Sequence, residues 1–356
     1  SSYRDSSDKL YWNKNQPMYI SVSTSANGSR SERLKSKTSA EYADPCFLDT
    51  EGVNYIRTKW AIDPNTKKLA VPKQEVMWEI YADGISPVST STFESTYSKK
   101  SNEGTIYSND LKLKLGSYDK TSGVKTIYYS LNKSAYKIYK SELNFSKEGL
   151  YHIKYFAIDK VGNSEPVVEK TFIVDPVPPE SSTTITGVYL GRENIVSTST
   201  KIYIEAKDKT SGVKTIKYWI DENTEKTYYK GVNVSLENFD DGKHILYFYA
   251  IDHVGNKEAH QNFNFYLDKT APITVSDILG DKFIVGDKIY FSGRTKLKIT
   301  SIDNKAGVKS VFYSIDNTDF EQYESPFYMP SKQGTHIVKY YSIDSTENIT
   351  RDQISR

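Results

Sequence analysis

Cysteine is almost absent from this chain of 356 residues, in which Cys46 stands alone. A single cysteine excludes a disulfide within the chain, so each folded unit must be stabilised by side-chain packing. No histidine neighbours Cys46 in sequence, which argues against a reactive thiol. We expect this thiol to lie in the core of the N-terminal part of the protein.

An excess of charge and long apolar segments are absent as well. Lys and Arg number 47 and Asp and Glu number 45, which gives a formal net charge of +2 with both signs interspersed. This balance predicts no nucleic-acid partner. No apolar run approaches the ~20 residues that a membrane-spanning helix needs. The start does not resemble a signal peptide, so we expect an exported form to have lost its targeting segment.

Signatures of catalysis and of cofactor binding are missing too. The sequence has no G-x-S-x-G elbow and no phosphate-binding glycine loop. His253 and His260 lie seven residues apart, with neither a cysteine nor a third histidine to complete a zinc set. We therefore expect no enzyme activity, no catalytic residue and no cofactor.

What the sequence does contain is a repeat with a period of about ninety residues. A turn motif, D-x-x-S/A-G-V, returns three times, and each copy is followed by an apolar strand that ends in A/S-I-D-x-x-G/E-N. The residues that fix these motifs are Asp119, Gly123, Asp159, Asn163, Asp208, Gly212, Asp252, Asn256, Asp303, Gly307, Asp344 and Asn348. Repetition at this period predicts a modular array.

The domain boundaries follow from a motif, F-x-V/L-D, at the end of two copies. It ends at Asp175 and at Asp268, and a proline follows soon after each. We predict domains at 1–97, 98–175, 176–268 and 269–356. The first is a divergent copy, in which Gly52 is placed over Gly212 and the segment Trp60–Asp63 over residues 218–221. The last stops before a counterpart of the closing strand and is expected to lack it.

The fold class follows from period-two alternation between turn signals. Ile216, Tyr218 and Ile220 fall on one side of a strand, with Lys217 and Trp219 on the other. No amphipathic helix of ten residues or more is indicated. The sequence therefore predicts an all-β protein, a tandem array of immunoglobulin-like or fibronectin-III-like β-sandwiches. Short proline-containing linkers predict stiff coupling into an elongated rod.

The order of the motifs, D-x-x-S-G-V-x-x-I-x-Y-x-I-D, G-x-H, A-I-D-x-x-G-N-x-E and F-x-V/L-D, resembles the Ig-like repeat of bacterial envelope and surface proteins that is catalogued as an outer-membrane-protein-type "β-barrel" domain. The match covers residues 98–356 well and the N-terminal part loosely. Lysines on the outer faces, at 154, 217 and 339, argue against a lipid-facing barrel. The resemblance implies an exported, non-catalytic module of the periplasm, outer membrane or cell surface of a Gram-negative bacterium.

The resemblance also implies a function in structure and interaction. We expect a rigid stalk or accessory subunit that binds a protein partner, such as an outer-membrane machine or a host matrix component. Two alternatives stay open: a carbohydrate-binding array of a polysaccharide-processing system, and a calcium-rigidified adhesin. The carbohydrate alternative depends on tyrosines between strands that could form an aromatic edge, namely Tyr139, Tyr228, Tyr229, Tyr323 and Tyr328.

The aspartate of the second motif follows core-facing residues at the end of a strand, where an unpaired carboxylate would cost several kcal/mol. In one interpretation, backbone N–H groups of the next loop donate to it. In the other, Asp208, Asp252 and Asp268, or their equivalents, bind calcium at a domain junction in the manner of cadherin modules. We favour the first, because no D-x-D-x-D run is present and Glu347 replaces the motif glycine in the last copy.

One ring position recurs two residues after a glycine and eight before the second-motif aspartate. It is occupied by Tyr151, His244 and His336. Its place at the start of a penultimate strand resembles the tyrosine corner of Ig sandwiches, in which a polar-tipped ring bonds back to nearby backbone. We expect these residues to be structural and not to ligate metal.

Overall fold

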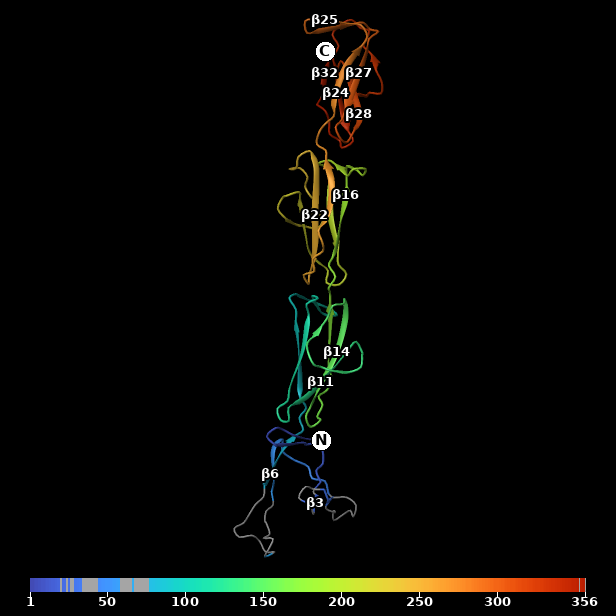
Figure 1. The fold of residues 1–356 in the computed structure, drawn as a ribbon. Helices are drawn as coiled ribbons and strands as arrows, with labels where there is room; N and C mark the ends of the chain where they lie inside the picture. Colours follow the sequence, from blue (N-terminus) through green and yellow to red (C-terminus); the bar gives the residue numbers. More distant parts are fainter. Residues whose placement is uncertain are drawn as a thin grey trace. The chain divides into compact units, whose positions relative to one another are not determined.

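The computed structural model describes residues 1–19, 21–23, 25, 29–33, 44–57, 66, 77–351 and 353–355, and every regular element in them is a β-strand (Figure 1). This follows from apolar residues that alternate with period two between glycine- and asparagine-rich turns. The chain divides into two compact units, Ser1–Pro176 and Val177–Arg356. Among the described residues, no helix is long and apolar enough to cross a membrane.

The first unit begins with a four-stranded sheet in the order β1-β2-β6-β5. Strand β2 runs parallel to β6, whereas β1 and β5 run antiparallel to their neighbours. The strands are β1 (Ser2–Arg4), β2 (Leu10–Asn13), β5 (Gly52–Arg57) and β6 (Met77–Asp83), and a separate pair is formed by β3 (Ser21–Ser23) and β4 (Ser31–Arg33).

A two-sheet sandwich completes the first unit. One sheet has the order β13-β10-β7 and the other β12-β11-β14-β15-β9-β8, in which β15 and β9 are parallel. Leu113 from one sheet and Ile153 and Phe172 from the other pack into one buried core. The strands are β7 (Val88–Glu94), β8 (Ser98–Ser101), β9 (Gly104–Tyr107), β10 (Lys112–Tyr118), β11 (Val124–Leu131), β12 (Lys137–Ile138), β13 (Leu143–Asn144), β14 (Gly149–Asp159) and β15 (Val168–Val174).

The second unit opens with a sandwich of the same plan. The pair β16-β19 packs against a sheet in the order β17-β18-β23-β22-β20-β21, again with one parallel pairing, β18 with β23. Ile202 and Ile204 meet Leu246 and Phe248 in its core. The strands are β16 (Glu180–Thr186), β17 (Tyr189–Leu190), β18 (Ile195–Val196), β19 (Lys201–Lys207), β20 (Val213–Ile220), β21 (Lys226–Tyr228), β22 (Gly242–Asp252) and β23 (Gln261–Leu267).

The last sandwich combines the sheets β24-β27-β30 and β29-β28-β31-β32 with a separate hairpin, β25-β26. Its closing strand was predicted to be missing, but β32 pairs with β31 from Gln353 opposite Tyr340, as β23 pairs with β22 from Gln261 opposite Phe248. Leu297 and Ile299 pack with Val338 and Tyr340 in its core. The strands are β24 (Ile273–Leu279), β25 (Lys282–Val285), β26 (Lys288–Phe291), β27 (Lys296–Ile302), β28 (Val308–Ile315), β29 (Glu321–Gln322), β30 (Phe327–Tyr328), β31 (Val338–Asp344) and β32 (Gln353–Ser355).

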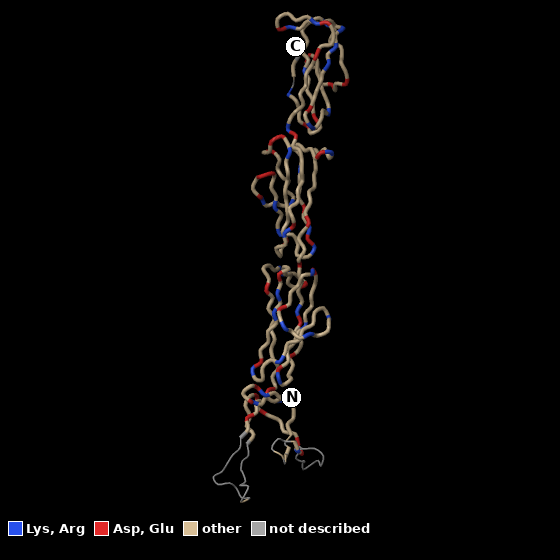
Figure 2. Tube along the Cα trace, in the orientation of Figure 1, with Lys and Arg blue, Asp and Glu red and all other residues tan. Residues whose placement is uncertain are grey.

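The structure confirms the predicted fold class, a series of Ig-like or fibronectin-III-like sandwiches. The predicted faces are also confirmed, since Ile216, Tyr218 and Ile220 pack on the core. Lys217 and Trp219 alternate with them on the outer face. Acidic and basic residues are mixed along the sandwiches, as the small net charge predicts (Figure 2).

An irregularity in strand pairing recurs at the same place in each sandwich. Directly after the turn motif, the register shifts between Val124 and Thr126 in the first copy. Equivalent shifts follow Val213 and Val308. The extra residue is a lysine each time, at 125, 214 and 309. A bulge of this kind increases local twist and helps to aim the preceding turn.

One predicted boundary is wrong. Strand β7 pairs along its whole length with β10, so Val88–Glu94 belongs to the first sandwich and not to the predicted 1–97 domain. The boundary lies near Asp83, at the end of β6. Asp83 therefore occupies the linker position that Asp175 and Asp268 occupy in the later copies.

The predicted alignment of the N-terminal copy is also wrong. Gly52 lies opposite Ala82 at the start of β5, as Gly242 lies opposite Leu267 at the start of β22. Gly52 thus corresponds to Gly242 and not to Gly212. The reason is that a glycine stands at or directly before the start of a strand at both places in the repeat, and only strand pairing distinguishes them.

Two further expectations concern the N-terminal part. Cys46 is exposed and forms only an isolated bridge with Met18, so its predicted burial is wrong. The cause is that neither residue belongs to a strand of the adjoining sheet. The segment Trp60–Asp63 lies outside the described residues.

Candidate functional site

The strand-exit aspartates hold the loop that follows them. Asp252 Oδ1 accepts hydrogen bonds from Val254 N and Asn256 N at 2.9 and 2.8 Å, and Asn256 Nδ2 donates to Oδ2 at 2.7 Å. The bonds from the asparagine recur at 2.7–2.8 Å between Asp159 and Asn163 and between Asp344 and Asn348. Each carboxylate is thus satisfied by the backbone and asparagine of its own loop.

The residue before this asparagine has left-handed backbone geometry. Gly162 and Gly255 have φ of +95° and +86°, and Glu347 has φ of +72°. The replacement of glycine by Glu347 leaves the loop unchanged, since the Asp344–Asn348 bonds match those of the other copies. An L-residue adopts this geometry at a cost of about 1–2 kcal/mol.

The turn-motif aspartates close their turns in the same way. The carboxylate of each accepts a bond from the amide four residues on, from Gly123 N at 2.7 Å, Gly212 N at 2.5 Å and Gly307 N at 2.8 Å. The amide one residue earlier in the turn is directed to the linker aspartate. Ser122 N donates to Asp83 Oδ2 at 3.0 Å, and Ala306 N donates to Asp268 Oδ2 at 3.1 Å.

These bonds gather three aspartates, one from the linker, one from the turn motif and one from the strand exit. In the first unit they are Asp83, Asp119 and Asp159; in the second they are Asp268, Asp303 and Asp344. Within each set, one carboxylate oxygen per residue lies within 4.8 Å of the others. We call them the first and second aspartate sets.

The structure therefore separates the three predicted calcium candidates. Asp268 belongs to the second aspartate set, whereas Asp208 and Asp252 bring carboxylate oxygens within 4.8 Å of each other at a different place. In sequence, Asp175 holds the linker position that goes with Asp208 and Asp252. A linker aspartate is thus grouped with the copy that follows it and not with the copy that it closes.

The linker and strand-exit members of both sets are fully buried. Burial raises the pKa of Asp159, and the negative charge of Asp83 raises it further. Burial likewise raises the pKa of Asp268, with added contributions from the charges of Asp303 and Asp344. The hydrogen bonds of each loop oppose this rise without cancelling it.

The three predicted corner residues each bond to the carbonyl four residues earlier. Tyr151 Oη donates to Lys147 O at 3.0 Å, while the Nε2 atoms of His244 and His336 lie 2.9 and 2.7 Å from the carbonyls of residues 240 and 332. A fourth residue of this kind was not predicted from the sequence. Asn54, two residues after Gly52, donates from Nδ2 to Thr50 O at 2.7 Å.

The two histidine corners also contact an aspartate. His244 Nδ1 lies 2.7 Å from Asp221 Oδ2, and His336 Nδ1 lies 2.7 Å from Asp316 Oδ2. The hydrogen bond with Asp316 raises the pKa of His336, and the same bond lowers the pKa of Asp316. These histidines are fixed by two partners each, which leaves no ring nitrogen free for a metal.

A buried glutamate was missed as a structural residue, although it is the final E of the second motif. Glu258 Oε1 accepts from Ala250 N at 2.6 Å and Oε2 accepts from Ser181 N at 3.1 Å, which joins β16 to β22. Glu165 makes the matching bonds to Ala157 N and Ser89 N. Threonine stands here in the last sandwich, at position 350.

The inter-strand tyrosines do not form one aromatic edge. Three of them pack edge-to-face on a tyrosine of the core at ring-centroid distances of 6.0–6.4 Å: Tyr139 on Tyr129, Tyr228 on Tyr218 and Tyr323 on Tyr313. Tyr229 and Tyr328 are exposed. The recurring tyrosine is therefore a core residue, as its period suggests.

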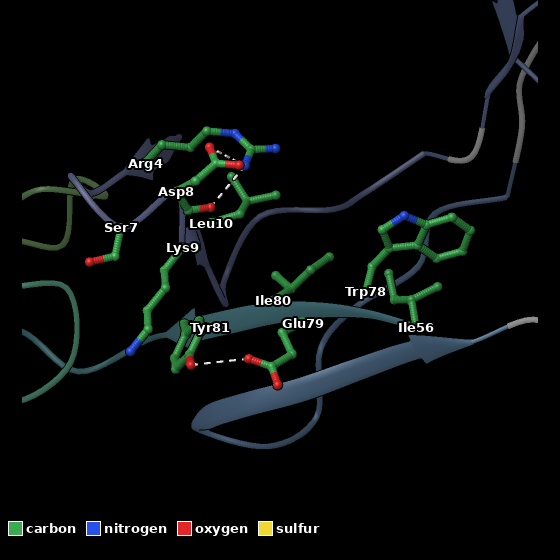
Figure 3. Close-up of a pocket in the computed structure, with 10 residues that line it drawn as sticks. All are labelled: Arg4, Ser7, Asp8, Lys9, Leu10, Ile56, Trp78, Glu79, Ile80 and Tyr81. Atoms are coloured by element: carbon green, nitrogen blue, oxygen red, sulfur yellow. Dashed lines mark hydrogen bonds and ion pairs between the residues drawn. The ribbon is translucent and has the colours of Figure 1, made fainter. Parts of the chain in front are cut away.

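A shallow pocket of about 620 Å³ lies on the N-terminal sheet (Figure 3). Ile56 and Trp78 line it and are direct cross-strand neighbours on β5 and β6. Arg4 and Asp8 form an ion pair of 2.9 Å at its other end. The pocket joins an apolar end, where Trp78 is 52% exposed, to a charged end.

No protein-family model matches the chain, and no curated protein matches it. Among solved structures, fibronectin(III)-like modules of Clostridium thermocellum CbhA share 12% identity over 50% of this chain and 94% of their own, with a TM-score of 0.28. A tetra-tandem repeat from the extending region of a large adhesion protein shares 12% identity over 86% of this chain and 81% of its own (TM-score 0.28). A structure from a 1.5-MDa bacterial ice-binding adhesin shares 11% identity over 70% of this chain and 91% of its own, with a TM-score of 0.34.

At these scores the matches carry no functional argument. The sheets themselves show a fibronectin-III-like or Ig-like repeat. The specific outer-membrane module that the motifs resemble is not confirmed by a family match.

Proposed function

We propose that this chain is a non-catalytic structural and interaction protein of the bacterial cell envelope or surface, a stalk or accessory subunit built from Ig-like sandwiches. The observation that carries the proposal is the use of the repeated polar residues. In every copy they hold turns, strand ends and corners, as Asp252, His244 and Glu258 do in one sandwich. Such a framework provides reach and surface, with reactive groups engaged in the fold.

The N-terminal sheet is the place that we propose for contact with a protein partner. It departs most from the repeat, and Tyr55, Ile56 and Trp78 are exposed on its last two strands. Exposed aromatic and apolar side chains beside charged ones are typical of protein interfaces. Arg4 and Asp8 at the other end of the pocket would give such a contact a polar rim.

A carbohydrate-binding array receives less support. Tyr139, Tyr228 and Tyr323, which recur between strands, pack on core tyrosines and offer no free ring face in common. Tyr229 is exposed beside a pocket of about 670 Å³, but this arrangement is not repeated at the exposed Tyr328, whose ring lies under Lys296.

The location is tested by treating intact cells of the native organism with an added protease. We expect the full-length protein to be cleaved while a cytoplasmic marker protein stays whole. Resistance of the protein until the cells are lysed would refute an exposed position on the surface. Recovery of such a resistant protein in a periplasmic extract would support the periplasmic version of the proposal. Recovery only in the cytoplasmic fraction would refute the proposed location altogether.

The contact is tested with two variants of the full chain, each of which removes one exposed aromatic ring. Trp78→Ala alters the proposed contact, and Tyr118→Ala alters a ring that is 70% exposed on the first sandwich. We expect the first variant to lose at least ten-fold in affinity for a partner isolated from the envelope or from a host surface, and the second to bind as the wild type does. Equal binding by both variants would refute this contact.

A further inference from the structure

The second aspartate set places three carboxylates together without a positive side chain. Asp268 and Asp344 are fully buried, and a carboxylate oxygen of Asp303 lies within 4.8 Å of one from each of them. Among the described residues, none of the three forms an ion pair with a lysine, arginine or histidine. Buried charges are normally paired or coordinate a metal, since desolvation without compensation is costly.

The hydrogen bonds of the loops leave one oxygen of this set unused. Asp303 Oδ2 accepts from Lys305 N and Gly307 N at 2.9 and 2.8 Å. Asp303 Oδ1 is buried and has no hydrogen-bond partner in the described part of the protein. An orphaned carboxylate oxygen inside a cluster of acids needs an electropositive partner, because a buried acceptor without one costs more than a neutral group would.

The first aspartate set repeats the acidic cluster at an independent place, with an unpaired hydroxyl in a residue bonded to it. Asp83 and Asp159 are fully buried, and Ser122, whose amide bonds Asp83, is only 4% exposed. Ser122 Oγ is buried and has no partner among the described residues. This unpaired hydroxyl oxygen belongs to the residue whose amide bonds Asp83, and a hydroxyl is an oxygen ligand of the kind that a hard cation takes.

We propose that Asp268, Asp303 and Asp344 bind a divalent cation, calcium in preference to magnesium, and that Asp83, Asp119 and Asp159 form a second site of the same type. Three carboxylates give the set a charge of −3 when ionised, and a divalent cation offsets most of it. The oxygens come from three separate segments, with Thr346 Oγ1 3.3 Å from Asp268 Oδ2 as a further donor atom. Calcium accepts such irregular oxygen sets and completes its shell with water, whereas magnesium demands near-octahedral geometry.

The cation would fasten the linker to the sandwich that it enters. Asp268 follows β23 directly, while Asp303 follows β27 and Asp344 ends β31. One ion would thus bridge the end of one sandwich and two strands of the next, and the first set would do the same between β6 and the strands β10 and β14. Calcium sites in extracellular modules have dissociation constants on the order of 0.1–1 mM. The inference does not depend on the partner contact proposed above.

The test is hydrogen–deuterium exchange of the full chain, read by mass spectrometry, in 5 mM calcium, in 5 mM magnesium and in chelator. We expect 5 mM calcium to slow exchange about 6-fold to 50-fold in the amides that border the second set, at residues 268–270, 303–307 and 344–348. The first set should respond in its own segments. No change between calcium and chelator would overturn the proposal, and equal protection by magnesium would overturn the assignment to calcium.

Two charge-removing variants make the assignment specific to each site. Asp303→Asn keeps an acceptor oxygen for Lys305 N and Gly307 N but removes the charge and the free carboxylate oxygen. We expect it to lower the affinity of the second set for calcium at least ten-fold and to leave the first set unchanged. Asp119→Asn should do the reverse, so each variant contains the other site as its internal control.

A third variant controls for net charge alone. Asp277→Asn removes one exposed negative charge from β24, in the same sandwich as the second set. It should respond to calcium as the wild type does. Retention of the full response in Asp303→Asn, or its loss in Asp277→Asn, would overturn the proposal. Hydrogen exchange in chelator shows whether Asp303→Asn is folded. If it is unfolded, the calcium response of the first set in Asp119→Asn tests the proposal at the equivalent site.

Discussion

The buried glutamate of the second motif allows a sharp test of how the sandwiches are held together. Glu258 is only 6% exposed and accepts two backbone hydrogen bonds, from Ala250 N on β22 and from Ser181 N on β16. Glu258→Ala removes both acceptors and leaves two buried N–H groups. Each such group costs about 1–3 kcal/mol. Because water enters part of the vacated space, we expect the variant to lose about 2–4 kcal/mol of stability in this sandwich.

The assay is native-state hydrogen exchange of the β22 amides, which reports this sandwich separately from the others. A tenfold change in exchange corresponds to about 1.4 kcal/mol, so these amides should exchange about 30-fold to 700-fold faster in Glu258→Ala. Glu205→Ala, at an exposed position on β19 of the same sandwich, is the matched control and should change exchange less than about three-fold. An equally small change in Glu258→Ala would refute the structural role of this carboxylate.

The remaining predictions concern backbone geometry, a titrating pair and a buried hydroxyl. Glu347→Gly should raise the stability of the last sandwich by about 0.5–1 kcal/mol, because glycine adopts the left-handed φ of +72° without strain; Gly255→Ala should lower that of its own sandwich, and thermal unfolding of both variants in the same direction would contradict this. The raised pKa of His336 means that its bond to Asp316 stabilises the fold fully below pH 6.5 and that this stabilisation is lost as pH rises through the folded pKa. The lowered pKa of Asp316 means that the same stabilisation is also lost in acid, as pH falls through the folded pKa of that carboxyl. His336→Tyr, which cannot titrate in this range, should therefore differ most from the wild type in unfolding temperature at about pH 5–6 and less at pH 8–9, and a constant difference would exclude the pair as the cause. Tyr228 Oη is buried without a partner, so Tyr228→Phe should stabilise its sandwich by about 1 kcal/mol in urea unfolding, whereas a loss of more than 1 kcal/mol would show that the hydroxyl is bonded.

Several features could be predicted from the sequence because they depend on local rules. Alternation with period two placed Ile216 and Tyr218 on the core face, and glycine, aspartate and asparagine marked the turns. The position of Tyr151 and His336 two residues after a glycine indicated a corner, and each residue does bond to the carbonyl four residues earlier. These features involve residues close in the chain, so spacing alone defines them.

Other features depend on which strands pair, and sequence spacing does not encode pairing. Gly52 matches Gly242 only because β5 pairs with β6 as β22 pairs with β23. The same reason moved the boundary to Asp83, since Val88–Glu94 pairs with β10. Cys46 was expected inside and is exposed, because no strand of the sheet contains it.

The candidate cation sites show most clearly which features the sequence determines and which depend on the tertiary structure. From the sequence alone, the repeat identified five of the six aspartates that take part, because a residue that recurs at a fixed place in each copy is held there by the fold. Asp83, in the divergent N-terminal part, was not identified. The repeat could not show that Asp268 joins Asp303 and Asp344, which lie 35 and 76 positions further along the chain, instead of Asp208 and Asp252. Only the tertiary structure decided this, because the end of one sandwich is bonded by the turn of the next, and long-range contacts of that kind bring distant carboxylates within 4.8 Å.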